Sequence, residues 1–259
     1  MSSTEILGAL AKALVAGSVK VVDLTQTLSE DTPLRVLPEP FGQTAAFSRQ
    51  EISRYDDRGV AWHWNNFTVG EHTGTHFDAP VHWVSGKDLP DNSVDKVPVG
   101  NLVAPAVVLD FSAECAADAD FLLTADHIKA WEEGHGAIPA GSWVLFRTDW
   151  SKKDAAGYTN RKEDGAHTPG PDTSAVDYLI GCDIWGFGVE TIGTDAGQAH
   201  RLTPPYPAHM LLHGAGRYGL QCLENLALVP RTRAMLICPP LKIRDGSGSP
   251  LRVLALVEG

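Results

Sequence analysis

The sequence has few cysteines, no block of basic residues and no long hydrophobic run, and each absence excludes a class of protein. Its four cysteines form no C-x-x-C pair, so their spacing indicates neither a structural zinc site nor a disulfide framework. Unpaired thiols are typical of a reducing cytoplasm, where we expect this protein to act. The four are Cys115, Cys182, Cys222 and Cys238.

Positive charge is also scarce, with 21 lysines and arginines against 32 acidic residues and a net charge of −11. Nucleic acids and anionic membranes are therefore not expected as partners. No apolar run reaches the roughly 18 residues needed to span a bilayer. Glu5 and Lys12 disfavour a signal peptide, and apolar residues at helical spacing predict an amphipathic first helix, namely Ile6, Leu7, Leu10 and Leu14.

The 259 residues, 43% of them hydrophobic, contain no internal repeat and no long linker, so we expect one domain over residues 1–259. Two helices besides the first are expected at 124–136, capped by Thr124, and at 172–182, capped by Asp172 or Thr173. The polar segment 151–171 is expected to be a surface loop. Short β-branched and aromatic stretches predict strands at 19–24, 64–70, 103–111, 142–150, 184–190, 234–240 and 252–258. Strands outnumber helices without strict alternation, which predicts an α/β protein of the α+β type.

The stretch HTGTHFDAPVHW, residues 72–83, contains three histidines and an aspartate. His72 and His76 alone would suit one face of a helix, but at about 100° per residue Asp78 would then point to the far side. In an extended chain the side-chain period is two, and these three residues and His82 all occupy even positions. The stretch therefore predicts an extended segment that directs His72, His76 and Asp78 at one point.

Two imidazoles and one carboxylate suit Zn²⁺, Mn²⁺ or Fe²⁺ and leave coordination positions for water and substrate. Such an ion lowers the pKa of a bound water and polarises a carbonyl, as amide hydrolysis requires. His82 lies on the same side of an extended chain and is the candidate general base. A lone histidine would favour an ordinary structural role, whereas four residues sharing one period favour a metal site.

These residues also carry a resemblance to a known family. HTGTHFDAPVH resembles the signature H-x-G-T-H-x-D-x-P-x-H of the metal-dependent cyclase-like hydrolases, with every fixed position matched. VVDLTQTLSEDTP resembles the family's first strand and loop, GVETIGTDAG its G-[VI]-[DE]-T segment, and PLKIRDGSGSPLRVLAL its C-terminal strands. The resemblance covers nearly the whole chain and implies a swivelling β/β/α fold and a homodimer or higher homo-oligomer.

The family includes bacterial N-formylkynurenine formamidases and isatin hydrolases, and the chain resembles the isatin hydrolases more closely. The resemblance implies His72, His76 and Asp78 as metal ligands and His82 as catalytic base. It implies one divalent ion, Mn²⁺ first and Zn²⁺ as the alternative. The expected reaction is the opening of a cyclic amide fused to an aromatic ring, isatin to isatinate. The pieces that match are GEHTGTHFDAPVHWVSGKD, DFLLTADHIKAWE, IGTDAGQA, PPYPAHMLLH and LKIRDGSGSPLRVLALV.

A second metal site is a further possibility that the resemblance raises. In the formamidases a distal histidine and a glutamate join the shared aspartate, and His209 and Glu224 are the candidates here. The H-x-x-L-L context favours His209 over His213. Because the interval from His209 to Glu224 is wider than in the formamidases, we expect one metal, with His209 beside it or touching the substrate.

Aromatic residues flank the motif, and we expect Trp83 and Trp64 to line an aromatic substrate pocket, with core packing as the alternative. GAGRYG, residues 214–219, matches G-x-G-x-x-G. It lacks the preceding strand and the later acidic residue of a dinucleotide site, so its glycines are expected in a turn.

Three readings compete with an isatin hydrolase. An arylformamidase acting on N-formylkynurenine would use the same chemistry, and the wide spacing to Glu224 argues against it. A non-catalytic metal-dependent binding protein would have no need of His82 as a base. A dinucleotide-dependent oxidoreductase would rest on GAGRYG alone.

Overall fold

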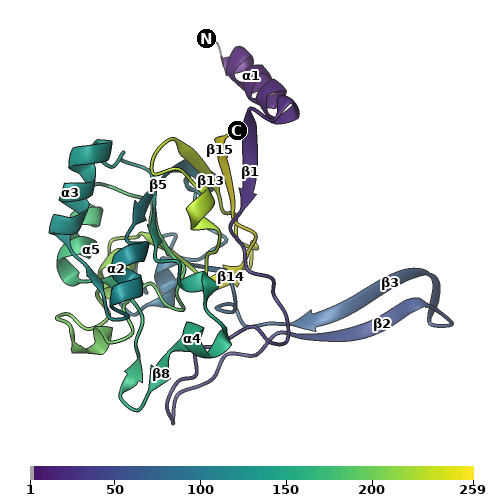
Figure 1. Cartoon of the computed structure of the whole chain (residues 1–259). Coiled ribbons are helices and arrows are strands. Elements are labelled where there is room, and N and C mark those ends of the chain that lie inside the picture. The colour runs from purple at the N-terminus through teal and green to yellow at the C-terminus, as the bar shows by residue number, and fades with distance from the viewer. Residues whose placement is uncertain (1–2) are drawn as a thin grey trace.

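The computed structural model describes residues 3–259, and its centre is a nine-stranded mixed sheet (Figure 1). The sheet contains β1 Val19–Asp23, β4 His76–Asp78, β5 Val103–Asp110, β7 Trp143–Arg147, β11 Gly186–Val189, β12 Tyr218–Gln221, β13 Ala234–Ile237, β14 Gly248–Pro250 and β15 Leu254–Glu258. Their order across the sheet is β1-β15-β13-β5-β7-β11-β12-β4-β14. Strands β5, β7, β11 and β12 run parallel to one another, and the other strand pairs of the sheet are antiparallel. The predicted α+β class is therefore confirmed.

The central strands β5, β7 and β11 are buried on both faces, which explains their nearly continuous apolar sequences. A Cβ built on Gly186 in β11 would lie 2.4 Å from the Trp143 ring and 2.7 Å from the Tyr218 carbonyl oxygen. Only glycine therefore allows β11 to lie between its two neighbouring strands while the Trp143 ring packs against its backbone.

Helices cover one face of the sheet (Figure 1). They are α2 Ser112–Ala117, α3 Ala125–His135 and α5 Thr173–Gly181; α1 Ser3–Ala16 and α4 Ala155–Thr159 lie apart from them. Both predicted caps are confirmed: Thr124 Oγ1 accepts a hydrogen bond from the His127 amide, and the Asp172 carboxylate accepts one from the Ala175 amide. Among residues 3–259, no helix has the length and hydropathy to cross a bilayer.

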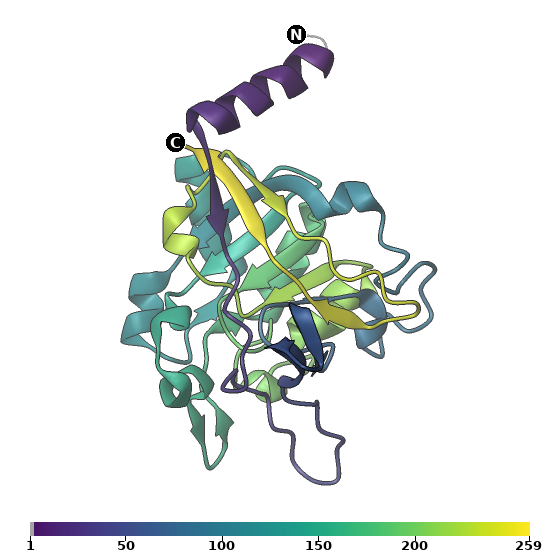
Figure 2. The same cartoon turned by 90° about the vertical axis from the view of Figure 1, so that its right-hand side faces the viewer.

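Two elements project from the body, as Figures 1 and 2 show. Helix α1 is confirmed, but its apolar side chains Ile6, Leu7 and Leu14 are exposed instead of packing on the sheet. The hairpin of β2 Ser48–Asp56 and β3 Gly59–Thr68 also extends into solvent. Its aromatic and aliphatic side chains have no cover within the chain, and exposed patches of this kind mark interaction surfaces.

Sequence reasoning missed several strands. Strand β2 is polar, and β12 and β14 have only three or four residues each, too short for an alternation pattern to stand out. The segment 151–171, expected to be a loop, contains α4 and three two-residue strands, so that expectation is wrong. These strands are β8 Arg161–Lys162, β9 Gly165–Ala166 and β10 Gly170–Pro171, the last pairing with β6 Leu122–Leu123.

Within this segment His167 makes close ion pairs with two carboxylates, 2.9 Å from Asp164 and 2.7 Å from Asp120. Hydrogen bonds to Asp164 and then Asp120 raise the pKa of His167. A raised pKa in the folded state stabilises the fold fully below the unfolded value, about 6.5, and this contribution disappears as pH rises through the folded value.

We therefore expect His167→Asn to lower the melting temperature more at about pH 5.5 than at about pH 9. The measurement is thermal unfolding at both pH values, with His200→Asn, an exposed histidine, as the matched control. Equal losses at the two pH values would contradict a charged role for His167.

Candidate metal and active site

The motif residues converge, although not as one extended segment. Only His76 and Asp78 lie on a strand, β4, where the period of two places both on one side. His72 lies in the preceding turn, and His82 ends a short 3₁₀ helix, Pro80–His82. The predicted convergence is correct for all four residues, while the predicted extended backbone is wrong on both sides of β4.

Asp78 is the centre of the site. It is fully buried, and its Oδ1 atom lies 2.8 Å from His72 Nδ1 and 3.4 Å from His76 Nε2. Burial opposes the charge on Asp78, but the adjacent imidazoles outweigh it and hold the pKa of this carboxyl well below its ordinary value. Asp78 is therefore a carboxylate at neutral pH.

His72 is oriented through its Nε2 atom by a chain of two hydrogen bonds. Glu71 accepts a bond of 2.6 Å from the Ser247 hydroxyl, whose oxygen lies 2.9 Å from His72 Nε2. Because the Ser247 proton goes to Glu71, the Ser247 oxygen accepts from Nε2–H, and the lone pair of His72 is on Nδ1. That lone pair faces the carboxylate oxygen of Asp78.

His76 presents a second lone pair to the same oxygen. Its Nδ1–H donates to the Gly74 carbonyl at 2.7 Å, which leaves Nε2 as an acceptor. This Nε2 is buried and has no hydrogen-bond partner. Buried polar atoms are rarely left unpaired, and three electron-rich atoms that face one point are the arrangement that suits a cation. The residues present therefore fit a divalent metal ion.

The close packing around His72 excludes a side chain on the neighbouring strand. A Cβ built on Gly248 in β14 would lie 2.4 Å from His72 Cε1 and 2.6 Å from the Phe77 carbonyl oxygen. Strand β14 pairs with β4, with Gly248 opposite Asp78. Glycine at this position therefore lets the C-terminal part of the chain pack closely against His72 and Asp78.

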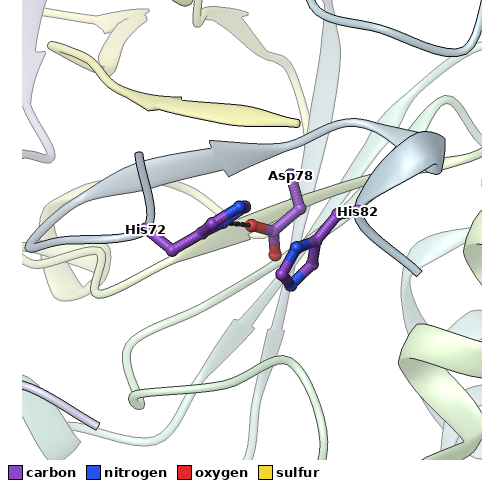
Figure 3. Close-up of side chains that lie close together, drawn as sticks. All are labelled: His72, Asp78 and His82. Atoms are coloured by element: carbon purple, nitrogen blue, oxygen red, sulfur yellow. Dashed lines mark hydrogen bonds and ion pairs between the residues drawn. The ribbon is translucent and has the colours of Figure 1, made fainter. Parts of the chain in front are cut away.

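His82 faces the same point, as Figure 3 shows for His72, Asp78 and His82. One nitrogen or oxygen atom from each of these residues lies within 4.8 Å of the others, and the His72 and His82 rings are 3.8 Å apart. Burial, with His72 and two further histidines nearby, lowers the pKa of His82 to about 3 against the attraction of Asp78. His82 is therefore neutral at pH 7 and can accept a proton.

A second group shares Asp78 and contains His209 and His213. His213 Nδ1–H donates to the Arg217 carbonyl at 3.0 Å, and its buried Nε2 has no partner. Burial lowers the pKa of His213 to about 4, so this ring is also neutral. Sequence reasoning named His209 and set His213 aside. Their spacing of four residues, which places two side chains on one face of a helix, could have indicated that both approach the same point.

Glu224 is not brought to this group. Its carboxylate lies 3.4 Å from Asn225 Nδ2, beside a separate cavity shared with Asp149 and Lys152. The residue that approaches Asp78 from β12 is Gln221, whose side-chain amide donates to the second carboxylate oxygen, Oδ2. Gln221 was missed because the register between β12 and β4, which pairs it with His76, is not local in sequence.

Of the two predicted pocket residues, only Trp83 lies at the site. Its ring is 4.8 Å from His209 and 5.8 Å from Tyr206. Tyr206 in turn lines a cavity of about 450 Å³ with both apolar and basic walls. Trp64 lies on the projecting β2–β3 hairpin and is 53% exposed, so it takes no part in the pocket of its own chain.

The GAGRYG stretch is a connection and not a nucleotide site. Gly214 ends the helical segment that carries His209 and His213, a turn follows, and β12 begins at Tyr218. Gly214 and Gly216 therefore precede a strand and Gly219 lies within it, whereas the glycines of a dinucleotide fingerprint follow a strand. Gly216 has a φ of +71°, which explains glycine there.

Comparison with known proteins agrees with this geometry. A family model described as "Putative cyclase" matches residues 22–196. An isatin hydrolase from Roseibium aggregatum is 50% identical over 99% of both chains. A kynurenine formamidase from Polaromonas naphthalenivorans is 28% identical over 93% of both chains.

The same likeness holds in three dimensions. The crystal structure of an isatin hydrolase bound to the product analogue thioisatinate superposes with a TM-score of 0.98, at 49% identity over the full length of both chains. The swivelling β/β/α fold that the motif implied is thereby confirmed. From the match of its sequence, its fold and its clustered histidines and aspartate, the chain belongs to the cyclase family of metal-dependent hydrolases.

Proposed function

We propose that this protein hydrolyses isatin to isatinate with one divalent metal ion. The observation that carries the proposal is the buried Nε2 atom of His76, which has no partner and faces the Asp78 carboxylate. The likeness to the isatin hydrolases described above supports the choice of substrate.

The ion would be held by His72, His76 and Asp78, with Mn²⁺ as the first choice and Zn²⁺ as the alternative. One ion per chain is supported by Gln221, because its neutral side-chain amide already donates to Asp78 Oδ2. A single carboxylate also supplies too little negative charge to balance two divalent ions.

When bound by His72, His76 and Asp78, the ion would supply Lewis acidity for the lactam carbonyl and would lower the pKa of a water molecule. His82, neutral at pH 7, removes a proton from that water. The new C–O bond forms at the amide carbon and the ring C–N bond breaks, giving a carboxylate and an arylamine. His82 then returns its proton to the nitrogen, so no serine or cysteine nucleophile is required.

The surroundings of the cluster suit an aromatic substrate that becomes an anion. Trp83 and Tyr206 form an edge-to-face pair beside His82 and His209. The cavity next to them is lined by three basic side chains, Arg35, Arg161 and Lys162, and by two acidic ones, Glu163 and Asp164. Aromatic walls would bind the benzo ring, and positive charge would attract the product carboxylate.

We also propose a homodimer, formed through the projecting hairpin, and a cytoplasmic location, which four free thiols support. Trp62 and Trp64 on β3 are 51% and 53% exposed. Burying such a side chain contributes about 1.5–3 kcal/mol, so a second copy that covers both would stabilise a dimer. The predicted role of Trp64 in a pocket would then depend on that second copy.

We expect the Trp62→Ser/Trp64→Ser variant to sediment as a monomer at micromolar concentration while the unaltered protein sediments as a dimer. Asn65→Ser, on the other face of the same strand, is the control and leaves the dimer intact. An unchanged mass of the double variant would show that the hairpin is not the interface.

The proposed activity is tested with protein stripped of metal and reloaded with Mn²⁺ or Zn²⁺. Isatin and N-formylkynurenine are followed by absorbance, and metal content is determined on the same samples. Loss of isatin that requires about one metal per chain is the expected result. Turnover of N-formylkynurenine alone with two metals per chain would indicate an arylformamidase, and metal binding without turnover of either would favour a binding protein.

A further inference from the structure

Asp195 forms a buried ion pair with His209, at the edge of the proposed site. Asp195 is 1% exposed and His209 is 6% exposed. One carboxylate oxygen, Oδ2, lies 2.5 Å from His209 Nδ1 and accepts from the His209 amide at 3.2 Å. The other oxygen accepts from the Ala208 amide at 2.7 Å. The carboxylate therefore fixes both the start of this helical segment and the ring that projects from it.

Glu190, which comes directly after β11, fixes the origin of the loop that carries Asp195. Its carboxylate accepts from the amides of Thr148 and Asp149 at 2.7 and 2.6 Å. The loop then runs through Thr194, whose hydroxyl lies 3.3 Å from His209 Nδ1. The loop that carries Asp195 is thus anchored at the ends of two sheet strands and not through the motif of residues 72–82.

The contact with Asp195 assigns the proton on the His209 ring. A carboxylate offers only lone pairs, so His209 Nδ1 must carry a hydrogen. Nε2 is then the atom that His209 contributes to its group with Asp78 and His213. His76 and His213 have the same arrangement, with Nδ1–H bound to a backbone carbonyl and Nε2 free.

We propose that Asp195 is a positioning residue, which holds His209 as the Nδ1–H tautomer and so directs an Nε2 lone pair at the substrate. Its effect on turnover rests on the proposed hydrolase function, whereas its effect on the tautomer does not. A fixed acceptor on the His209 ring, whose centre lies 4.8 Å from that of Trp83, would receive the N–H of a bound lactam and orient its carbonyl. Aspartates orient catalytic histidines by this principle in other hydrolases.

The test is the Asp195→Asn variant, compared with the unaltered protein in metal-free and Zn²⁺-loaded form. Asparagine that keeps its oxygen for the Ala208 amide loses the contact with the His209 amide, and its NH₂ group then faces Nδ1, which favours the Nε2–H tautomer. Tautomers are read from the ¹⁵N shifts of the His209 ring, assigned with His209→Gln. The control is Asp120→Asn, because Asp120 makes the same type of contact with His167 Nδ1, at 2.7 Å, and belongs to neither group around Asp78.

The unaltered protein is expected to show His209 as the Nδ1–H tautomer at about pH 8, and Asp195→Asn as the Nε2–H tautomer. With isatin, kcat is expected to fall about 10²-fold while KM and metal content stay within a factor of two, and Asp120→Asn to change none of them. A purely structural Asp195 would lower the melting temperature without exchanging the tautomer.

Two results would overturn the proposal. One is a doubly protonated or Nε2–H His209 in the unaltered protein, a result that needs no variant to fold. The other is an exchanged tautomer in Asp195→Asn with an undiminished kcat. If the unaltered protein does not hydrolyse isatin at all, the proposed function fails, and the tautomer measurement still decides the role of Asp195.

Discussion

Replacing His76 with alanine is expected to abolish metal binding and isatin turnover together. His76 is buried, its Nδ1–H is held by the Gly74 carbonyl, and Nε2 has no function in the chain except to face Asp78. Changes behind a metal ligand cost about 10–100-fold in affinity or activity, and loss of a ligand should cost more. Metal content after gel filtration and the rate of isatin loss, measured on the same samples, check the prediction.

The matched control is Glu224→Gln, because Glu224 was a candidate ligand that the structure places elsewhere. It should keep about one metal per chain and the full rate. A His76→Ala protein that retains stoichiometric metal would move the site away from β4. Loss of metal in Glu224→Gln would instead mean that this carboxylate reaches the ion.

His82→Ala is expected to keep its metal and to turn over isatin about 10²–10⁴-fold more slowly. The loss corresponds to about 2.7–5.4 kcal/mol of transition-state stabilisation. The reason is that His82 is neutral, close to Asp78 and His72, and free to take a proton, while His72 and His76 complete the metal set without it. Single-turnover rates on metal-loaded protein separate this step from binding.

The same geometry allows His82 to bind the metal itself, since one of its nitrogens lies within 4.8 Å of the His72 and Asp78 atoms. Metal content therefore decides between the two roles: a base leaves it unchanged, and a ligand does not. His135→Ala removes a histidine from α3, where Nδ1 is bound to the Trp131 carbonyl, and should leave rate and metal content intact. A normal rate in His82→Ala would exclude the base role.

Much of the fold was readable from local sequence. The helices at 124–136 and 172–182 begin with side chains that bond the amide three residues on, and such contacts need no distant partner. The central strands are continuous apolar runs because both faces are buried. The strands next to the site carried no such signal, since β12 and β14 take their conformation from pairing with their neighbours.

The candidate site, like the fold, combines features that local sequence predicts with features that depend on distant contacts. The motif on β4 places His76 and Asp78 two residues apart on one strand face, a relation that chain geometry alone determines. His72 and His82 also meet at Asp78, but through a turn and a 3₁₀ helix that a simple alternation of side chains did not predict. Trp64 was placed in the pocket by its proximity in sequence, and the hairpin carries it away.

By itself, then, the sequence predicted that His72, His76, Asp78 and His82 cluster, because they lie within a dozen positions of one another, and its matching pieces along nearly the whole chain indicated the family. Only the tertiary structure places His213 and Gln221 beside Asp78, Asp195 beside His209, and Glu224 at a separate cavity. These side chains lie more than a hundred residues from Asp78 along the chain. What brings them there is the antiparallel register of β12 on β4 and the buried carboxylate of Asp195 that anchors the His209 segment. Both are long-range contacts that no local pattern encodes.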